Sequence, residues 1–81
     1  QDFRVNTGPG VTNINYARVY NRWGDVMSEA RNLTPDAGGA IIWDGRYRGR
    51  PAPSGVYIYI IEIEFTDGEK LVYRGDLTLI R

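Results

Sequence analysis

The sequence contains no cysteine, no histidine, one methionine and no long apolar run. The missing cysteines exclude disulfides, and the absence of both residue types removes the usual signature of a structural zinc site. The longest apolar run, residues 56–61, is far shorter than the roughly 18 to 20 residues that a transmembrane helix needs. We therefore expect this 81-residue chain to form one domain, residues 1–81, without a cofactor, metal or transmembrane segment, held by apolar burial and strand pairing.

The chain has no excess of charge of either sign. Ten Lys and Arg residues are balanced by ten Asp and Glu residues, giving a net charge of 0. Nucleic-acid and anionic-membrane binding depend on a basic surplus, so we expect no nucleic-acid partner. The chain starts at Gln1 with neither an initiator methionine nor a basic and apolar leader, which indicates a segment of a longer protein.

Residues suited to catalysis are also scarce. There is no histidine base and no cysteine nucleophile, and Ser28 and Ser54 have no recognisable base partner. Glu62 and Glu64 share one face of an expected strand, either as a carboxylate pair for glycoside hydrolysis or as a solvated outer face. We favour the solvated face and expect no enzymatic activity.

What the chain does have is short apolar stretches separated by glycine and proline. No helical periodicity lasts for three turns, which indicates strands throughout. The expected strands cover residues 3–7, 12–21, 25–29, 40–43, 55–66 and 69–80, and Pro35, Gly38 and Gly39 make a helix over residues 30–39 improbable. Six or seven such strands favour an antiparallel two-sheet sandwich that closes with a long C-terminal hairpin.

Alternation along this hairpin specifies its register. A two-residue turn would place apolar residues opposite charged ones. A three-residue loop, with Thr66 and Asp67 in a type I turn and Gly68 left-handed, pairs Phe65 with Glu69 and keeps both apolar rows on one face. The pairs expected further along are Ile63 with Leu71, Ile61 with Tyr73, Tyr57 with Leu77, Glu64 with Lys70, and Tyr59 with Gly75.

The abundant aromatic residues allow two interpretations. Flat rings on a sheet surface can stack on sugars, but most tyrosines here fall on the alternating face expected to form the core. The turn around Asn21 and Gly24 raises the same question. Trp23 either anchors one corner of the core, which we favour, or forms with Arg22 an exposed platform for a sugar or a peptide.

A second Gly- and Pro-rich segment follows Trp43. Asp44 is suited to accept backbone hydrogen bonds in a tight turn, while Gly45 and Gly49 allow positive φ angles. Asp44 could alternatively be a metal ligand or an acid, although no second carboxylate lies at a suitable spacing. We therefore expect a structural loop here.

Taken together and in order, these motifs resemble those of the gliding-motility-associated C-terminal domain, which is the type B sorting domain of the type IX secretion system. The residues that carry the resemblance are Asn21-Arg22-Trp23-Gly24, Trp43-Asp44-Gly45 with Gly49 and Pro51, Gly55-Val56-Tyr57, and Gly75-Asp76-Leu77-Thr78-Leu79-Ile80-Arg81. The middle motif alone also resembles the immunoglobulin-like domain of flagellar hook-capping proteins. Family members often begin with an Asn-, Gly- and Asp-rich segment that is absent before Phe3, so a first strand or an ion site is expected upstream.

The resemblance implies an immunoglobulin-like sandwich at the C-terminus of an exported passenger protein. Such a protein crosses the periplasm and is delivered to the cell surface or the extracellular space after recognition by outer-membrane components of the translocon. We expect the recognition residues to be Leu77, Thr78, Leu79, Ile80 and Arg81 in the last strand, together with Arg22 and Trp23. The alternative is a carbohydrate- or protein-binding accessory module of a secreted enzyme or adhesin.

Overall fold

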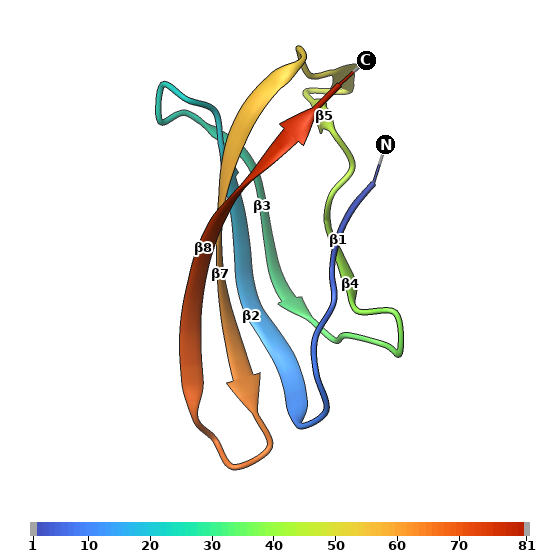
Figure 1. Cartoon of the computed structure of the whole chain (residues 1–81), viewed down its shortest axis with the longest axis vertical. Coiled ribbons are helices and arrows are strands. Elements are labelled where there is room, and N and C mark those ends of the chain that lie inside the picture. Colours follow the sequence, from blue (N-terminus) through green and yellow to red (C-terminus); the bar gives the residue numbers. More distant parts are fainter. Residues whose placement is uncertain (1, 81) are drawn as a thin grey trace.

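A computed structural model describes residues 2–80 of the chain (Figure 1), and these residues form an all-β fold. Arg81, one of the expected recognition residues, lies outside the described residues. Within residues 2–80 there is no helix that could cross a membrane. The strands are β1 (Phe3–Val5), β2 (Val11–Tyr20), β3 (Val26–Leu33), β4 (Ala40–Trp43), β5 (Arg46–Tyr47), β6 (Arg50–Pro51), β7 (Gly55–Phe65) and β8 (Lys70–Leu79).

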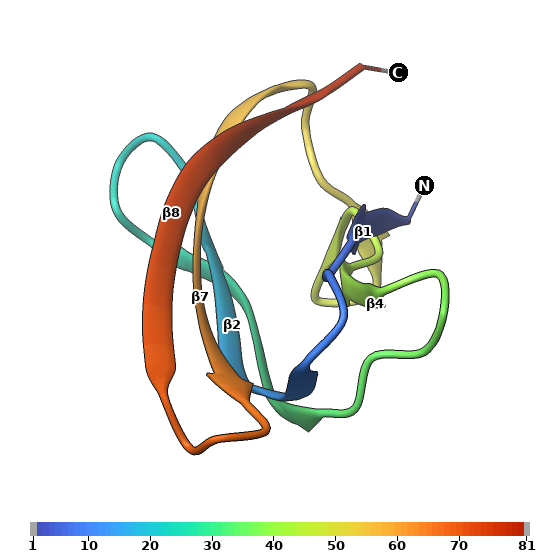
Figure 2. The same cartoon turned by 60° about the horizontal axis from the view of Figure 1, so that its bottom comes forward.

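The fold has two layers, as expected for a sandwich. An antiparallel sheet in the order β3-β2-β7-β8 forms one layer, and the shorter β1-β4 pair faces it (Figure 2). Apolar residues at alternate positions of the large sheet point toward β4 and the loop after it. The buried core consists of Ile14, Ala17, Val19, Ala40, Ile42, Trp43, Ala52, Tyr57, Ile61, Ile63 and Leu79.

The register of the β7–β8 hairpin is confirmed. The Phe65 N–H donates to the Glu69 carbonyl at 2.8 Å, and the Gly68 N–H donates to the Phe65 carbonyl at 2.9 Å, with Gly68 at φ 87°. This is the three-residue loop with a left-handed glycine. The expected pairs follow along the ladder, from Glu64 opposite Lys70 to Tyr57 opposite Leu77.

Several strand boundaries differ from the expected ones. Strand β3 continues to Leu33 because Ala30 and Leu33 pair with Ala17 and Ile14 of β2, so the expected loop shortens to residues 34–39. Strand β1 ends at Val5, two residues early. The two-residue strands β5 and β6 were not expected, since each is too short for alternation to be visible.

The apolar face of β8 is less buried than its alternation indicated. Leu79 is fully buried, but Leu71 is 40% exposed and Tyr73 is 48% exposed. The β1-β4 layer has only two strands, and beside it an apolar groove lined by Val5, Phe65 and Tyr73 stays open. The expectation that this whole row lies in the core was therefore wrong for its first two side chains.

Candidate functional site

The end of β8 divides into buried and exposed residues. Leu79 has no exposed surface and Leu77 is partly buried, whereas Thr78 is exposed and Ile80 is 75% exposed. Leu77 and Leu79 therefore belong to the sandwich. Thr78 and Ile80 present their side chains to solvent.

The outer edge of β8, here called the terminal edge, has no neighbouring strand within residues 2–80. In an antiparallel ladder, hydrogen-bonded pairs alternate with non-hydrogen-bonded pairs. Phe65 and Glu69 form a hydrogen-bonded pair, so the alternation makes Tyr57 and Leu77 another. It follows that the backbone N–H and C=O groups of Asp76 and Thr78 point away from β7, toward the open edge.

The turn between β2 and β3 is held by the side chain of Asn21. Its Oδ1 accepts the backbone N–H groups of Trp23 and Asp25, each at 2.9 Å, and its Nδ2 donates to Asp25 Oδ2 at 3.1 Å. Gly24 takes φ 89° and donates its N–H to the Asn21 carbonyl at 3.0 Å. The expected turn roles of Asn21 and Gly24 are confirmed.

Trp23 does not anchor the core, contrary to the favoured interpretation. Its side chain is 76% exposed, and the Arg22 guanidinium carbon lies 4.9 Å from the centre of its ring. Trp23 lies within the turn that the Asn21 side chain holds, and it is not among the buried core residues. The exposed-platform interpretation is the one that matches the geometry.

The loop after Trp43 has the expected structural role. Asp44 Oδ1 accepts the Arg46 N–H at 3.0 Å, and Gly45 and Gly49 have φ angles of 75° and 77°. The buried Trp43 ring lies 4.9 Å from the ring of Tyr57, and its Nε1 donates to the Arg46 carbonyl at 2.9 Å. These contacts fix the loop against the core.

The β5–β6 hairpin turns through Arg48 and Gly49. Tyr47 pairs with Arg50 across this turn, and both central residues have positive φ, 52° and 77°, as in a type I′ turn. Arginine is an unusual choice at the first position because a left-handed conformation costs an ordinary residue roughly 1 to 2 kcal/mol. The Arg48 guanidinium lies 5.1 Å from the centre of the Tyr47 ring.

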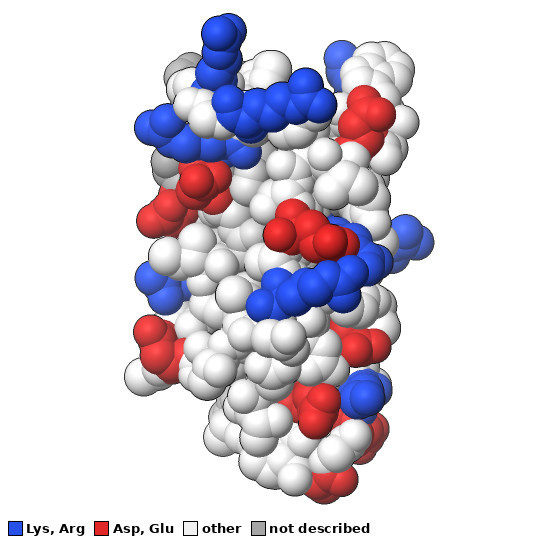
Figure 3. Space-filling view, turned by 180° about the vertical axis from the view of Figure 1, so that it is seen from behind, with Lys and Arg blue, Asp and Glu red and all other residues white. Residues whose placement is uncertain are grey.

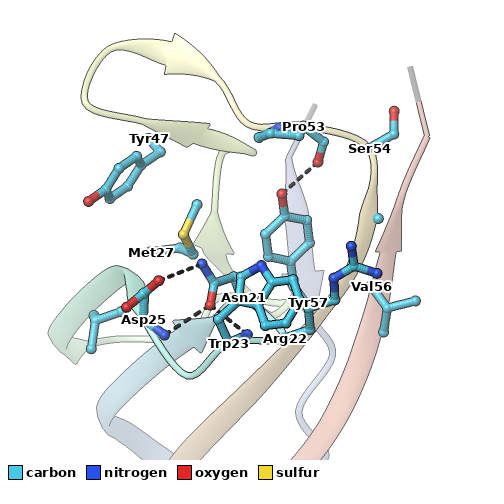
Figure 4. Close-up of a pocket in the computed structure, with 12 residues that line it drawn as sticks. Asn21, Arg22, Trp23, Asp25, Met27, Tyr47, Pro53, Ser54, Val56 and Tyr57 are labelled. Atoms are coloured by element: carbon cyan, nitrogen blue, oxygen red, sulfur yellow. Dashed lines mark hydrogen bonds between the residues drawn. The ribbon is translucent and has the colours of Figure 1, made fainter.

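These two turns border one pocket, here called the turn pocket, of about 600 Å³ (Figure 4). Its lining combines exposed apolar side chains with polar groups that are already hydrogen-bonded, among them the Tyr57 hydroxyl, which donates to the Pro53 carbonyl at 2.5 Å. The lining residues are Asn21, Arg22, Trp23, Asp25, Val26, Met27, Tyr47, Pro53, Ser54, Gly55, Val56 and Tyr57. Of the sequence-predicted recognition residues, only Arg22 and Trp23 meet here.

Basic side chains gather at the end of the molecule that carries β5 (Figure 3). Arg22, Arg46, Arg48 and Arg50 take part in no ion pair within residues 2–80. The sequence shows the Arg-Tyr-Arg-Gly-Arg run openly, but only the fold places one of its residues, Tyr47, in the same pocket as Arg22. Tyr47 and the arginine stacked on it, Arg48, were therefore not among the recognition residues expected from the sequence.

On the outer face of the sheet, by contrast, Arg18 and Arg31 are both paired with an acidic side chain, Glu29. Arg18 Nε donates to Glu29 Oε2 at 2.5 Å, and Arg31 Nη2 lies 3.4 Å from the same oxygen. The hydrogen bond from Arg18 lowers the pKa of Glu29, and the same bond raises the pKa of Arg18. Arg18 and Glu29 therefore form an ion pair with each other.

The carboxylates considered for catalysis lie outside both pockets. Asn15 Nδ2 donates to Glu62 Oε2 at 3.0 Å and to Glu64 Oε1 at 3.1 Å, so the two side chains share one amide on the sheet surface. Of the other candidates, Ser54 lines the turn pocket and Ser28 lies on β3. Within residues 2–80, no group of three or more acidic side chains converges on a metal site.

Comparison with known proteins gives one family match. The model of the CHU_C type IX secretion signal domain matches residues 2–79, which include both turns and all of β8. No curated protein and no solved structure matches the chain. A family model that spans the fold from β1 to β8 identifies the domain, and the chain belongs to the type IX secretion signal domain family, whose members direct proteins for export toward the cell surface or the extracellular space.

Proposed function

We propose that the translocon reads this secretion signal at the terminal edge, by adding a strand of an outer-membrane component beside β8. The passenger reaches this component from the periplasm, and the domain contributes recognition rather than catalysis. Residues 77–80 are the described part of the proposed contact segment, and Arg81, which follows in the sequence, belongs to the same proposed recognition set. This proposal refines the secretion role that the family provides.

The open backbone of β8 is the observation that supports the proposal. Unpaired N–H and C=O groups along an edge strand are a template for a partner strand, and main-chain hydrogen bonds supply affinity in such complexes. Charged or twisted edges discourage this pairing, but after the exposed Asp76 the side chains on the exposed side are uncharged, Thr78 in β8 and Ile80 just past its end. A partner strand would pair with the outward groups of Thr78 and cover the Ile80 side chain.

Deleting the end of β8 does not test this proposal cleanly. Leu79 is fully buried and Leu77 is partly buried, so loss of residues 77–81 removes core as well as edge. A cleaner variant is Thr78→Pro. It removes one outward N–H from an exposed position, and edge strands accept proline where the N–H faces solvent.

The experiment joins a signal peptide, a fluorescent reporter and this chain, and measures reporter at the surface of cells with a working type IX translocon. Thr78→Val is the matched control because it changes the side chain and keeps the N–H group. We expect Thr78→Pro to reduce surface delivery by at least tenfold and Thr78→Val to leave it unchanged. Denaturant unfolding of both purified variants establishes that they are folded.

Normal delivery of a folded Thr78→Pro variant would show that strand addition at this position is not how the signal is read. Equal loss in both variants would assign the effect to the Thr78 side chain, which also contradicts the proposal. The two outcomes leave the family assignment in place and remove only the contact mode.

A further inference from the structure

We infer that the turn pocket binds an extended acidic segment of a protein partner, with apolar side chains between its carboxylates. The inference rests on the proposed function only in placing the partner in the secretion machinery. The pocket is lined by the β2–β3 turn, by Tyr47 of β5 and by residues 53–57, and it borders the terminal edge at Val56, the partner of Thr78, without including residues of β8. Three features of the pocket carry the inference.

The first feature is a group of exposed apolar side chains in the lining. Trp23 is 76% exposed, Val26 is 50% exposed and Val56 is 51% exposed, and all three line the pocket. Figure 4 shows Trp23 and Val56 in the same part of the pocket as Tyr57. Grouped exposed apolar side chains with a polar border are typical of protein interaction sites.

The second feature is a pair of stacked arginines. Arg22 lines the pocket and lies against the ring of Trp23, and Arg48 lies against the ring of Tyr47, which also lines it. Stacking restricts a guanidinium while its planar N–H edge remains suited to bidentate binding of a carboxylate. A carboxylate partner supplies the counter-charge that these arginines lack within residues 2–80.

The local charge balance supports an anionic occupant. The lining holds one arginine and one aspartate, Arg22 and Asp25, and the adjoining residues 44–50 add three arginines and one aspartate, a net charge of +2. The aspartate that lines the pocket, Asp25, accepts a hydrogen bond from Asn21 Nδ2. Charge complementarity of this kind steers encounter and selects partners.

The third feature is the conformation of Arg48. Its φ of 52° places an arginine where a type I′ turn favours asparagine, aspartate or glycine. Strained residues of this kind concentrate at binding sites, where the position of the side chain matters more than local stability. The hairpin thus holds a cation at its tip beside the pocket, at a conformational cost.

The same geometry favours a peptide over a glycan. The Asn21 amide, which could bind sugar hydroxyls, already accepts two backbone N–H groups through Oδ1 and donates to Asp25 through Nδ2. The Arg22 guanidinium occupies one face of the Trp23 ring, where a sugar would stack. Valine side chains suit an apolar peptide residue better than a hydroxylated ring.

The test is a titration of the ¹⁵N-labelled 81-residue chain, followed by NMR, with a capped heptapeptide of alternating glutamate and valine. We expect shifts concentrated at residues 21–26 and 46–50, with binding that weakens as salt increases. The heptapeptide with lysine in place of glutamate should not bind. A galacturonate oligomer, a carboxylated glycan, should bind at least tenfold more weakly than the glutamate peptide.

Three variants make the test specific. Trp23→Ala should weaken peptide binding roughly 30-fold, as for an interface hot spot. Arg48→Gln should weaken it about fivefold, as for one exposed charge contact. Lys70→Gln is a matched loss of a basic side chain at the first residue of β8, and it should leave binding unchanged because β8 begins at the end of the molecule opposite to β5 (Figure 1).

The inference is wrong if the glutamate peptide leaves residues 21–26 and 46–50 unshifted, or if galacturonate binds as tightly as the peptide. Thr78 does not itself line the turn pocket, but it is the cross-strand partner of Val56, which does, so the titration uses the chain without the Thr78→Pro change. Failure of the terminal-edge proposal in the export assay and failure of this inference in the titration are therefore separate results.

Discussion

The ring of Tyr59 lies directly over Gly75, its partner on β8. A Cβ atom added to Gly75 would lie 2.5 Å from the Tyr59 hydroxyl oxygen and 2.7 Å from Cζ, closer than atoms can approach. Tyr59 also lines the open apolar groove, so its ring covers a part of the sheet that the β1-β4 layer does not reach. The absence of a side chain at Gly75 therefore leaves the space that the Tyr59 ring occupies.

Gly75→Ala should therefore destabilise the domain by about 1 to 3 kcal/mol, the usual cost of overpacking. The reason is displacement of the Tyr59 ring, since the Gly75 backbone is not left-handed. In a Tyr59→Leu background the same change should cost under ~0.5 kcal/mol, because the clash is gone. Urea unfolding of the four proteins measures the coupling, and an equal cost in both backgrounds would contradict the contact.

The two tryptophans should respond oppositely to truncation. Trp43 is 3% exposed and packs between Phe3 and Tyr57, so Trp43→Ala should cost about 3 to 5 kcal/mol. Trp23→Ala should change the free energy of unfolding by no more than ~0.5 kcal/mol, because the side chain is largely exposed. Similar losses for the two variants in denaturant unfolding would show that Trp23 packs against the domain in solution.

Arg48→Asn and Arg48→Gln should separate turn conformation from charge. Both changes remove the guanidinium and its stacking on Tyr47, but only asparagine tolerates the left-handed conformation well. We expect the asparagine variant to be more stable than the glutamine variant by about 0.5 to 1 kcal/mol. Thermal unfolding should show this as a Tm difference of roughly 2 to 8 °C, and no difference would argue against strain at the tip.

The outer-face charge cluster should make stability depend on acid pH. The pKa of Glu29 is lower in the folded state, chiefly because Arg18 donates a hydrogen bond to its carboxylate. Its contribution is therefore present above the unfolded pKa and is lost as the pH falls through the folded pKa. Glu29→Gln should remove this part of the acid dependence in unfolding measured from pH 7 to pH 2, and an unchanged profile would contradict the assignment.

The hairpin could be predicted because its side chains alternate over many positions and a single loop length reconciles both rows. The pairing of Phe65 with Glu69 followed from this consistency, as did the pairing of Tyr59 with Gly75. Strand ends were harder to predict where pairing with a neighbouring strand, rather than the local sequence pattern, determines them. Strand β3 extends to Leu33 because Leu33 pairs with Ile14, although its sequence neighbours are polar. Strands β5 and β6 have too few residues to show a period.

The binding surface was harder to predict from sequence than the fold. Trp23 was assigned to the core because large aromatic residues are usually buried, and only the geometry of the Asn21 turn shows that it points outward. Arg22 and Arg48 are far apart in the sequence, and the β2–β3 turn and β5–β6 hairpin meet only in three dimensions. Local patterns indicate each turn but not their convergence.

The central claim, that these residues carry an export signal for the type IX translocon, is tested most directly by comparing two hosts. The chain is fused behind a signal peptide and a fluorescent reporter, and surface fluorescence is measured in cells that have a working translocon and in cells that lack it. The account predicts reporter at the surface only where the translocon works. Equal surface fluorescence in the two hosts would contradict it.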